Sequence, residues 1–274
     1  MAVAPASAAH GIDDHPHCCL DPFNFGRRSV GRSASASVAE SQLRQVKVLT
    51  AAERCAHASR TKGEPPMSLE LHTWNTPNGR KISVALEEMG LPYTVHPINI
   101  SKDEQFSPAF LKISPNNRIP AIIDHDGPGG TPISVFESGA ILIYLGEKTG
   151  KFWPKDLRRQ VPVLEWLMWQ MGGFGPMPGQ VHHFLQVKDE QDRRYGLERY
   201  SKETRRLYGV LDKRLGEVEF VGGDISIADF AILGWAWRHE RHQVDLADFP
   251  NVKRWYEAIM ARPGVQRGFA VSLS

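Results

Sequence analysis

The chain has 274 residues, enough for one large domain or two small ones with substantial cores. Its 33 basic and 31 acidic residues give a formal charge of +2, without the basic surplus typical of a dedicated nucleic-acid binder. No apolar run approaches the ~18 residues of a membrane span. All three cysteines, Cys18, Cys19 and Cys55, lie in the first quarter, so residues 67–274 hold no thiol for a disulfide, a thiolate metal site or a nucleophile.

Residues 1–66 are rich in Ala, Ser, His and Arg and show no sustained helical or strand period. Such a segment cannot bury enough apolar surface to offset its ordering entropy. We expect either a disordered extension or an upstream start codon, with Met67 as the working start. Without a compact apolar region after a basic start, a secretory signal is disfavoured, and a cytoplasmic protein is expected. Cys18 and Cys19 beside His15 and His17 fit no zinc spacing, so we predict no metal site.

Residues 67–150 alternate strand and helix patterns and form one predicted domain. A βαβαββα order is expected, with the first two strands parallel because a helix connects them, and the last two antiparallel because a turn does. The predicted elements are strands 69–74, 93–100, 121–124 and 133–136 and helices 79–89, 108–113 and 138–149.

Residues 151–274 favour an all-helical second domain. Helices are expected over 160–170, 192–215, 227–238 and 251–262. The Gly- and Pro-rich run 172–179 is expected to interrupt the helical structure between the first two. Ser226 and Asp229 have the spacing of a capping box at the start of the third helix.

A βαβ half followed by a ββα half is the thioredoxin-type arrangement, in which redox members carry Cys-Pro-x-Cys just after the first strand. Here that position holds Thr76–Gly79, with Thr76 and Gly79 replacing the two cysteines. The helix N-terminus still favours an anion, and the Thr76 hydroxyl and Asn78 amide can each donate to a bound thiolate. A plain helix start, with Asn78 as a turn residue, is the alternative.

Two further segments suggest what such a ligand would be. If the Ile119–Pro120 bond is cis, the Ile119 backbone is free to pair with an extended peptide, although a plain trans turn is the commoner arrangement. Ser138, where a strand meets a helix, can bind a carboxylate and Glu137 an ammonium group, unless Ser138 is only an ordinary cap. An extended peptide with a central thiol and an amino-acid head is glutathione.

With these motifs, residues 67–274 resemble the glutathione transferases along their whole length. The resemblance is strongest to the bacterial nu class, the glutathione-dependent disulfide-bond oxidoreductase group. It rests on Thr76–Gly79, Ile113–Ala121, Phe136–Leu145, Trp169–Met177 and Glu198–Tyr200. The resemblance implies a thioredoxin-like N-terminal domain, an all-α C-terminal domain and a homodimer, while residues 1–66 have no counterpart in it.

The resemblance also implies a role for each matching residue. Thr76 and Asn78 would face the sulfur, and Gln105 would bind the glycine end. Ile119 would pair with the cysteinyl backbone, next to Arg118, where relatives carry Lys. The γ-glutamyl head would lie against Glu137 and Ser138, and Arg199 would bind a carboxylate of a second glutathione.

The expected activity is thiol–disulfide exchange without a catalytic cysteine. One glutathione thiolate attacks a small disulfide substrate, and a second glutathione resolves the mixed disulfide. Conjugation of glutathione to electrophiles and non-catalytic, regulatory glutathione binding are the alternatives. Neither nucleic acid nor membrane is an expected partner.

Overall fold

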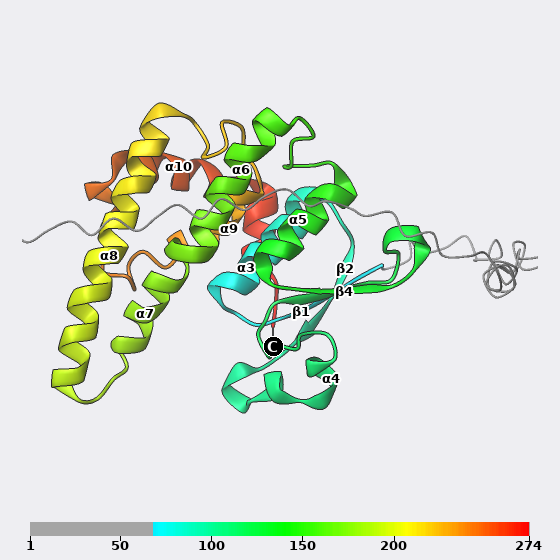
Figure 1. Cartoon of the computed structure of the whole chain (residues 1–274), viewed down its shortest axis with the longest axis horizontal. Coiled ribbons are helices and arrows are strands. Elements are labelled where there is room, and N and C mark those ends of the chain that lie inside the picture. Colours follow the sequence, from blue (N-terminus) through cyan, green and yellow to red (C-terminus); the bar gives the residue numbers. More distant parts are fainter. Residues whose placement is uncertain (1–67, 274) are drawn as a thin grey trace, which may run out of the picture. The chain divides into compact units, whose positions relative to one another are not determined.

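The computed structural model of the chain describes residues 68–273 (Figure 1). Its first half is a four-stranded mixed sheet made of β1 (Leu69–Thr73), β2 (Tyr93–Pro97), β3 (Ala121–Asp124) and β4 (Ile133–Phe136). The strand order is β2-β1-β3-β4, with β2 parallel to β1 and β3 antiparallel to both β1 and β4. The predicted βαβαββα order and strand directions are confirmed. The prediction for residues 1–66 lies outside the described residues.

Helices cover both faces of this sheet. Helices α3 (Pro77–Met89) and α5 (Ser138–Thr149) pack against one face, where apolar side chains such as Leu71, Ile82 and Ile141 form the core. The short helix α4 (Pro108–Leu111) lies on the other face, where the rings of Phe110 and His72 are 6.4 Å apart. Short 3-10 turns occupy Ile100–Lys102, Glu104–Phe106 and Pro128–Gly130. Strand alternation explains the two faces, since every second residue of β1 is buried toward α3.

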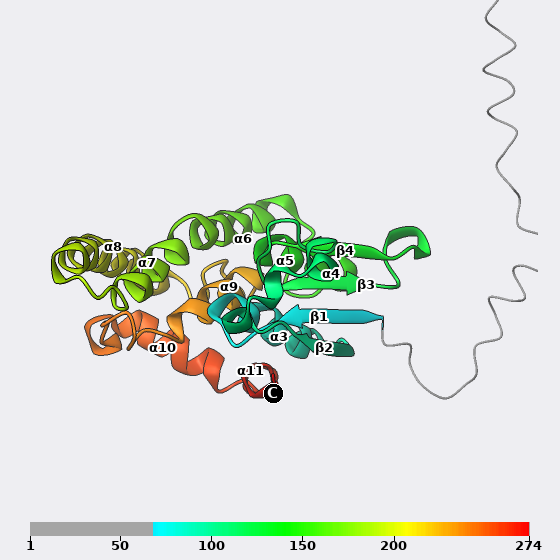
Figure 2. The same ribbon diagram turned by 90° about the horizontal axis from the view of Figure 1, so that it is seen from below.

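The second half is helical, as expected, and Figure 2 shows most of its helices to one side of the sheet. It consists of α6 (Leu157–Trp169), α7 (Pro176–Phe184), α8 (Glu190–Glu217), α9 (Ile227–Ala236), α10 (Pro250–Met260) and α11 (Pro263–Ala270). A π-helical turn, η4 (Gln170–Phe174), joins α6 to α7, and a 3-10 turn spans Leu246–Asp248. No helix within residues 68–273 has the length and apolar character needed to cross a membrane.

The α-helix before the Gly- and Pro-rich run 172–179 ends at Trp169, as expected, but the run itself is largely helical, because η4 covers Gln170–Phe174 and α7 begins at Pro176. Pro176 begins α7, where a missing N–H costs nothing. The glycines serve close packing instead: a Cβ on Gly175 would lie 2.8 Å from Nε2 of Gln170, and one on Gly179 would lie 3.1 Å from the Trp235 ring. Helix-breaking residues here permit a close approach of α7 to α9.

Two helices of the second half return to α3. Both α9 and α11 pack against it, and Gly234 of α9 approaches so closely that a Cβ there would lie 2.5 Å from the carbonyl oxygen of Pro77. The predicted capping box holds the start of α9, because the Asp229 carboxylate accepts hydrogen bonds from the backbone N–H and the hydroxyl of Ser226, both 2.9 Å long. The second half of the chain therefore packs directly against the first turn of α3.

Candidate functional site

The N-terminus of α3 is built for a ligand that carries negative charge. Thr76 is the N-cap, and its Oγ1 accepts a hydrogen bond of 3.1 Å from the N–H of Gly79. Gly79 has no room for a side chain, because a Cβ would lie 2.3 Å from the carbonyl oxygen of Trp74. The Thr76 hydroxyl proton is not used in the cap bond, so it can be donated to an acceptor in front of the helix.

Asn78 is held by a residue that the sequence motif did not reveal. The indole N–H of Trp235, on α9, donates to Oδ1 of Asn78 over 2.9 Å. Indole is a donor only, so it fixes the orientation of the amide and leaves the Asn78 NH₂ group to donate elsewhere. The contact spans 157 residues of sequence, which is why local spacing could not predict it.

Lys81 is the second residue that the motif did not reveal. It lies one turn after Asn78 and is fully buried, with its Nζ donating to Oε1 of Gln170 over 2.6 Å and to Oγ of Ser138 over 3.2 Å. Burial lowers the pKa of Lys81 to about 7, while the negative charge of Glu137 opposes that shift. Lys81 thus joins the N-termini of α3 and α5 through a buried amine.

A cavity of about 340 Å³ opens beside these groups. Its lining comes from α3, from η4 and α7, and from α9: Asn78, Lys81, Gln170, Met171, Gly175, Pro176, Gly179, Gln180 and Trp235. The cavity therefore lies between the two halves of the chain, with Asn78 and Lys81 in its lining.

The segment before β3 carries Arg118 and Ile119. Ser114 stabilises this turn by donating its hydroxyl to the carbonyl oxygen of Arg118 over 2.7 Å, and the Arg118 side chain is exposed. The Ile119–Pro120 peptide bond is cis. Among residues 68–273, neither the N–H nor the C=O of Ile119 has a backbone partner, so both can pair with an extended ligand.

Glu137 and Ser138 lie where β4 meets α5. Glu137 is the N-cap residue and has a φ of 69°, a left-handed conformation that is costly for a side-chain-bearing residue and that often marks a binding site. Its carboxylate accepts a 3.4 Å hydrogen bond from the Asn116 amide, which ties it to the segment before β3. Ser138 begins the helix and is buried beside Lys81. This arrangement offers an anion site and a carboxylate side by side.

Gln105 lies in the 3-10 turn Glu104–Phe106 and is buried. Its Nε2 is 3.4 Å from Oδ1 of Asp103, and its Oε1 is buried without a partner among the described residues. A buried amide oxygen without a hydrogen bond costs free energy that a ligand donor can recover.

Arg199 belongs to a different hollow. It lines a pocket of about 620 Å³ along α8, together with Met177 of α7 and Tyr195 and Tyr200 of α8. The lining of this pocket and the lining of the Lys81 cavity have no residue in common. Helix α7 contributes to both hollows, with Met177 facing the Arg199 pocket and Pro176 facing the Lys81 cavity.

Comparisons with known proteins identify both halves. Residues 76–148 match the family model of the glutathione S-transferase N-terminal domain, and residues 175–263 match that of the C-terminal domain. The chain is 50% identical to the disulfide-bond oxidoreductase YfcG of Escherichia coli (strain K12) over 71% of this chain and 91% of that protein.

Solved structures agree with that family. A glutathione transferase from Pseudomonas putida with one glutathione disulfide bound per subunit is 42% identical, with a TM-score of 0.70, over 77% of this chain and 94% of that one. One from Burkholderia graminis with two glutathione molecules per subunit is 43% identical, with a TM-score of 0.70, over 76% and 90%.

Proposed function

This chain belongs to the glutathione S-transferase family, and from that premise we propose that it is a glutathione-dependent disulfide-bond oxidoreductase. The observation that carries the proposal is the N-terminus of α3, where Thr76 takes the place of a cysteine in a fold whose residues 67–274 contain none. The reacting sulfur is then that of bound glutathione. The nu class is the group within the family to which we assign the chain.

The helix N-terminus and two side-chain donors form the thiolate site. A free thiol has a pKa near ~8.5. To lower that pKa by about two units, the site must stabilise the thiolate over the thiol by about 2.7 kcal/mol. The helix dipole, the Thr76 hydroxyl and the Asn78 amide share that task.

The remaining residues position the peptide. Ile119 pairs with the cysteinyl backbone next to Arg118. The Gln105 amide hydrogen-bonds the glycine end, where its NH₂ group can donate to the carboxylate and its unpartnered Oε1 can accept from a ligand N–H. Glu137 and Ser138 hold the γ-glutamyl head. Arg199, in its own pocket, binds a carboxylate of a second glutathione.

The reaction proceeds by two exchanges. The bound thiolate attacks one sulfur of a small disulfide, so that a new S–S bond forms, the substrate S–S bond breaks, and the released thiolate takes a proton from water. A second glutathione thiolate then attacks the glutathionyl sulfur and releases the other substrate thiol. Two glutathiones become one glutathione disulfide, and the substrate gains two electrons.

The test compares reduction of a small model disulfide by glutathione with conjugation of an aromatic halide. We expect faster disulfide reduction in the wild type. Thr76→Val should lose most of it, Thr76→Ser should keep it, and Thr131→Val, at an exposed turn, should match the wild type. Conjugation faster than reduction would favour the transferase alternative, and glutathione binding without either turnover would favour a regulatory protein.

We further propose that the protein acts as a homodimer in the cytoplasm, where glutathione keeps thiols reduced. An exposed apolar stripe on α6 supports self-association: Leu157, Val161, Leu164 and Met168 recur at helical spacing and are 39% to 69% exposed. Contiguous apolar surface of this kind is typical of protein contacts.

A further inference from the structure

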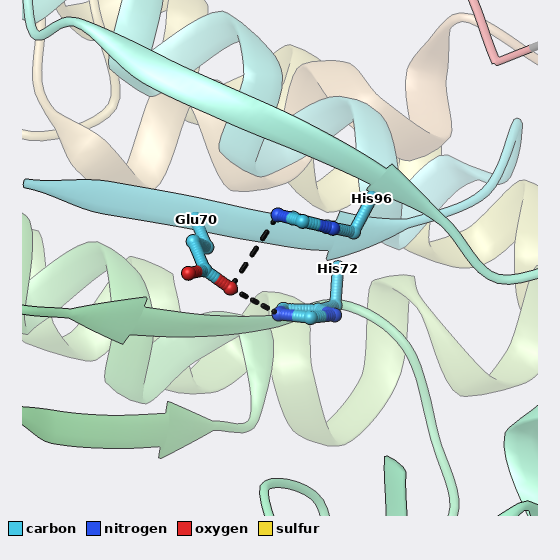
Figure 3. A group of neighbouring side chains, drawn as sticks. All are labelled: Glu70, His72 and His96. Carbon is cyan, nitrogen blue, oxygen red and sulfur yellow. Dashed lines mark hydrogen bonds and ion pairs between the residues drawn. The ribbon is translucent and has the colours of Figure 1, made fainter. Parts of the chain in front are cut away.

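A cluster of imidazoles surrounds one carboxylate on the face of the sheet turned away from α3. Figure 3 shows Glu70 and His72 of β1 beside His96 of β2. The Nε2 atoms of His72 and His96 lie 3.2 and 3.4 Å from the same carboxylate oxygen, Oε2 of Glu70. Nothing in the proposed glutathione chemistry uses these residues.

Strand register builds the cluster. Glu70 and His72 are two residues apart on β1, so both point to one face. His96 is the direct parallel partner of His72, and the two rings stack with centroids 4.7 Å apart and planes 14° from parallel. Positions fixed by a sheet are rigid, so the three side chains converge without needing a flexible loop. The sequence spacing alone, with His72 and His96 24 positions apart, gave no sign of this.

Two of the three distances between ligand atoms match the shell of a small metal ion. A tetrahedral Zn²⁺ with bonds of about 2.0–2.1 Å separates neighbouring ligand atoms by about 3.3–3.4 Å. The two nitrogen–oxygen distances in the cluster are 3.2 and 3.4 Å, and the ligand atoms of all three residues lie within 4.8 Å of one another. Imidazole nitrogen with carboxylate oxygen is a ligand set suited to zinc and its neighbours in the first transition row.

A fourth residue holds the carboxylate from its other side. His125, directly after β3, has its Nε2 2.7 Å from Oε1 of Glu70. A ligating carboxylate is commonly oriented by such a partner, which fixes the oxygen that faces the metal. His125 therefore leaves Oε2 of Glu70 to the two stacked histidines.

We propose that Glu70, His72 and His96 form a binding site for one divalent transition-metal ion of the Zn²⁺ type, with His125 orienting the Glu70 carboxylate. A fourth coordination position is left to water. Bound metal joins the edge strand β2 to the central strand β1 and stabilises the folded chain. The site needs no cysteine and is independent of the glutathione chemistry.

The experiment measures Zn²⁺ bound per full-length chain by equilibrium dialysis after chelation and removal of the chelator. His96→Asn should bind one Zn²⁺ fewer than the wild type, whereas His183→Asn, at an exposed position on α7, should bind the same amount. This difference isolates the site from any binding by residues 1–66. Equal stoichiometry in His96→Asn and the wild type would overturn the proposal.

Two further variants separate metal binding from simple hydrogen bonding. Glu70→Gln should abolish the rise in melting temperature that Zn²⁺ gives the wild type, and His125→Asn should weaken Zn²⁺ binding about 10- to 100-fold. Substituted Co²⁺ should show tetrahedral absorption bands in the wild type that are missing in His96→Asn. A Zn²⁺-induced shift in melting temperature that is the same in Glu70→Gln and the wild type would contradict the assignment.

Discussion

Lys81 is an ionisable residue whose charge state the ligand can set. Burial lowers its pKa to about 7, so at pH 8 the amine is mostly neutral in the free protein. A glutathione carboxylate at Ser138 would lie near the amine, which is 3.2 Å from the Ser138 hydroxyl, and would raise the lysine pKa again. Binding at pH 8 should therefore take up protons.

Calorimetry in buffers of different ionisation enthalpy measures that uptake. The ligand should be S-methylglutathione, which has no thiol to release a proton of its own. We expect the wild type to take up protons on binding, and Lys155→Met, a control at an exposed position, to take up the same amount. Lys81→Met should lack the part of the proton uptake that the Lys81 amine gives. Identical uptake in Lys81→Met and the wild type would remove Lys81 from the binding site.

Sequence patterns identified the site residues that can be recognised from their neighbours in the sequence. Thr76 and Asn78 follow a strand and open a helix, and Ser138 begins a helix after another strand, so their positions could be predicted from neighbours alone. Lys81 and Trp235 could not be, because their roles depend on η4 and α9 packing onto α3 across long stretches of sequence. Their polar atoms become a site only after the helical half folds.

At the scale of elements, α11 shows a packing constraint that sequence patterns did not predict. This short helix packs along α3, and Gly268 faces Val84 so closely that a Cβ would lie 2.5 Å from the Val84 Cα. Gly268→Ala must push the two backbones apart and should lower the free energy of unfolding by about 1–3 kcal/mol. Denaturant unfolding measures the change.

Gly209→Ala is the matched control for that substitution. Gly209 is exposed on α8, and its added Cβ would approach nothing closer than 4.0 Å. Helix propensity then predicts a gain of about 0.5–1 kcal/mol. If both alanine variants changed stability in the same direction and by the same amount, close packing of α11 on α3 would not be the cause.

The directions within two strand pairs were predictable, because a helical crossover makes β1 and β2 parallel and a short turn makes β3 and β4 antiparallel. The sheet order and the antiparallel pairing of β1 with β3 were not predicted from these local connections. The run 172–179 shows the limit of such local rules. Gly and Pro residues favour a break in isolation, but here their small size and the N-terminal position of Pro176 let η4 and α7 continue.

At the scale of the whole molecule, the α6 stripe predicts how copies associate. A charge placed at Met168 would have to be buried in any interface that covers the stripe, and burying an unpaired carboxylate is costly. Met168→Glu should shift the mass measured by light scattering from dimer to monomer, whereas Tyr195→Glu, an exposed position on α8, should not. A wild type that is already monomeric would exclude the homodimer.

The location of every cysteine in residues 1–66 gives a test of where the reacting sulfur resides. If glutathione supplies it, replacing Cys18, Cys19 and Cys55 together by serine leaves the thiolate site at Thr76 and Asn78 complete. The triple variant should reduce the model disulfide at the wild-type rate, and pretreatment of the wild type with a thiol-alkylating reagent, removed before assay, should not inhibit it. Loss of disulfide reduction in the triple variant, with its melting temperature and glutathione affinity unchanged, would instead place an essential thiol within residues 1–66. The Thr76→Val variant gives an independent test of whether glutathione or a protein cysteine is the nucleophile. A protein cysteine would not depend on the Thr76 hydroxyl, so disulfide reduction would then survive in Thr76→Val.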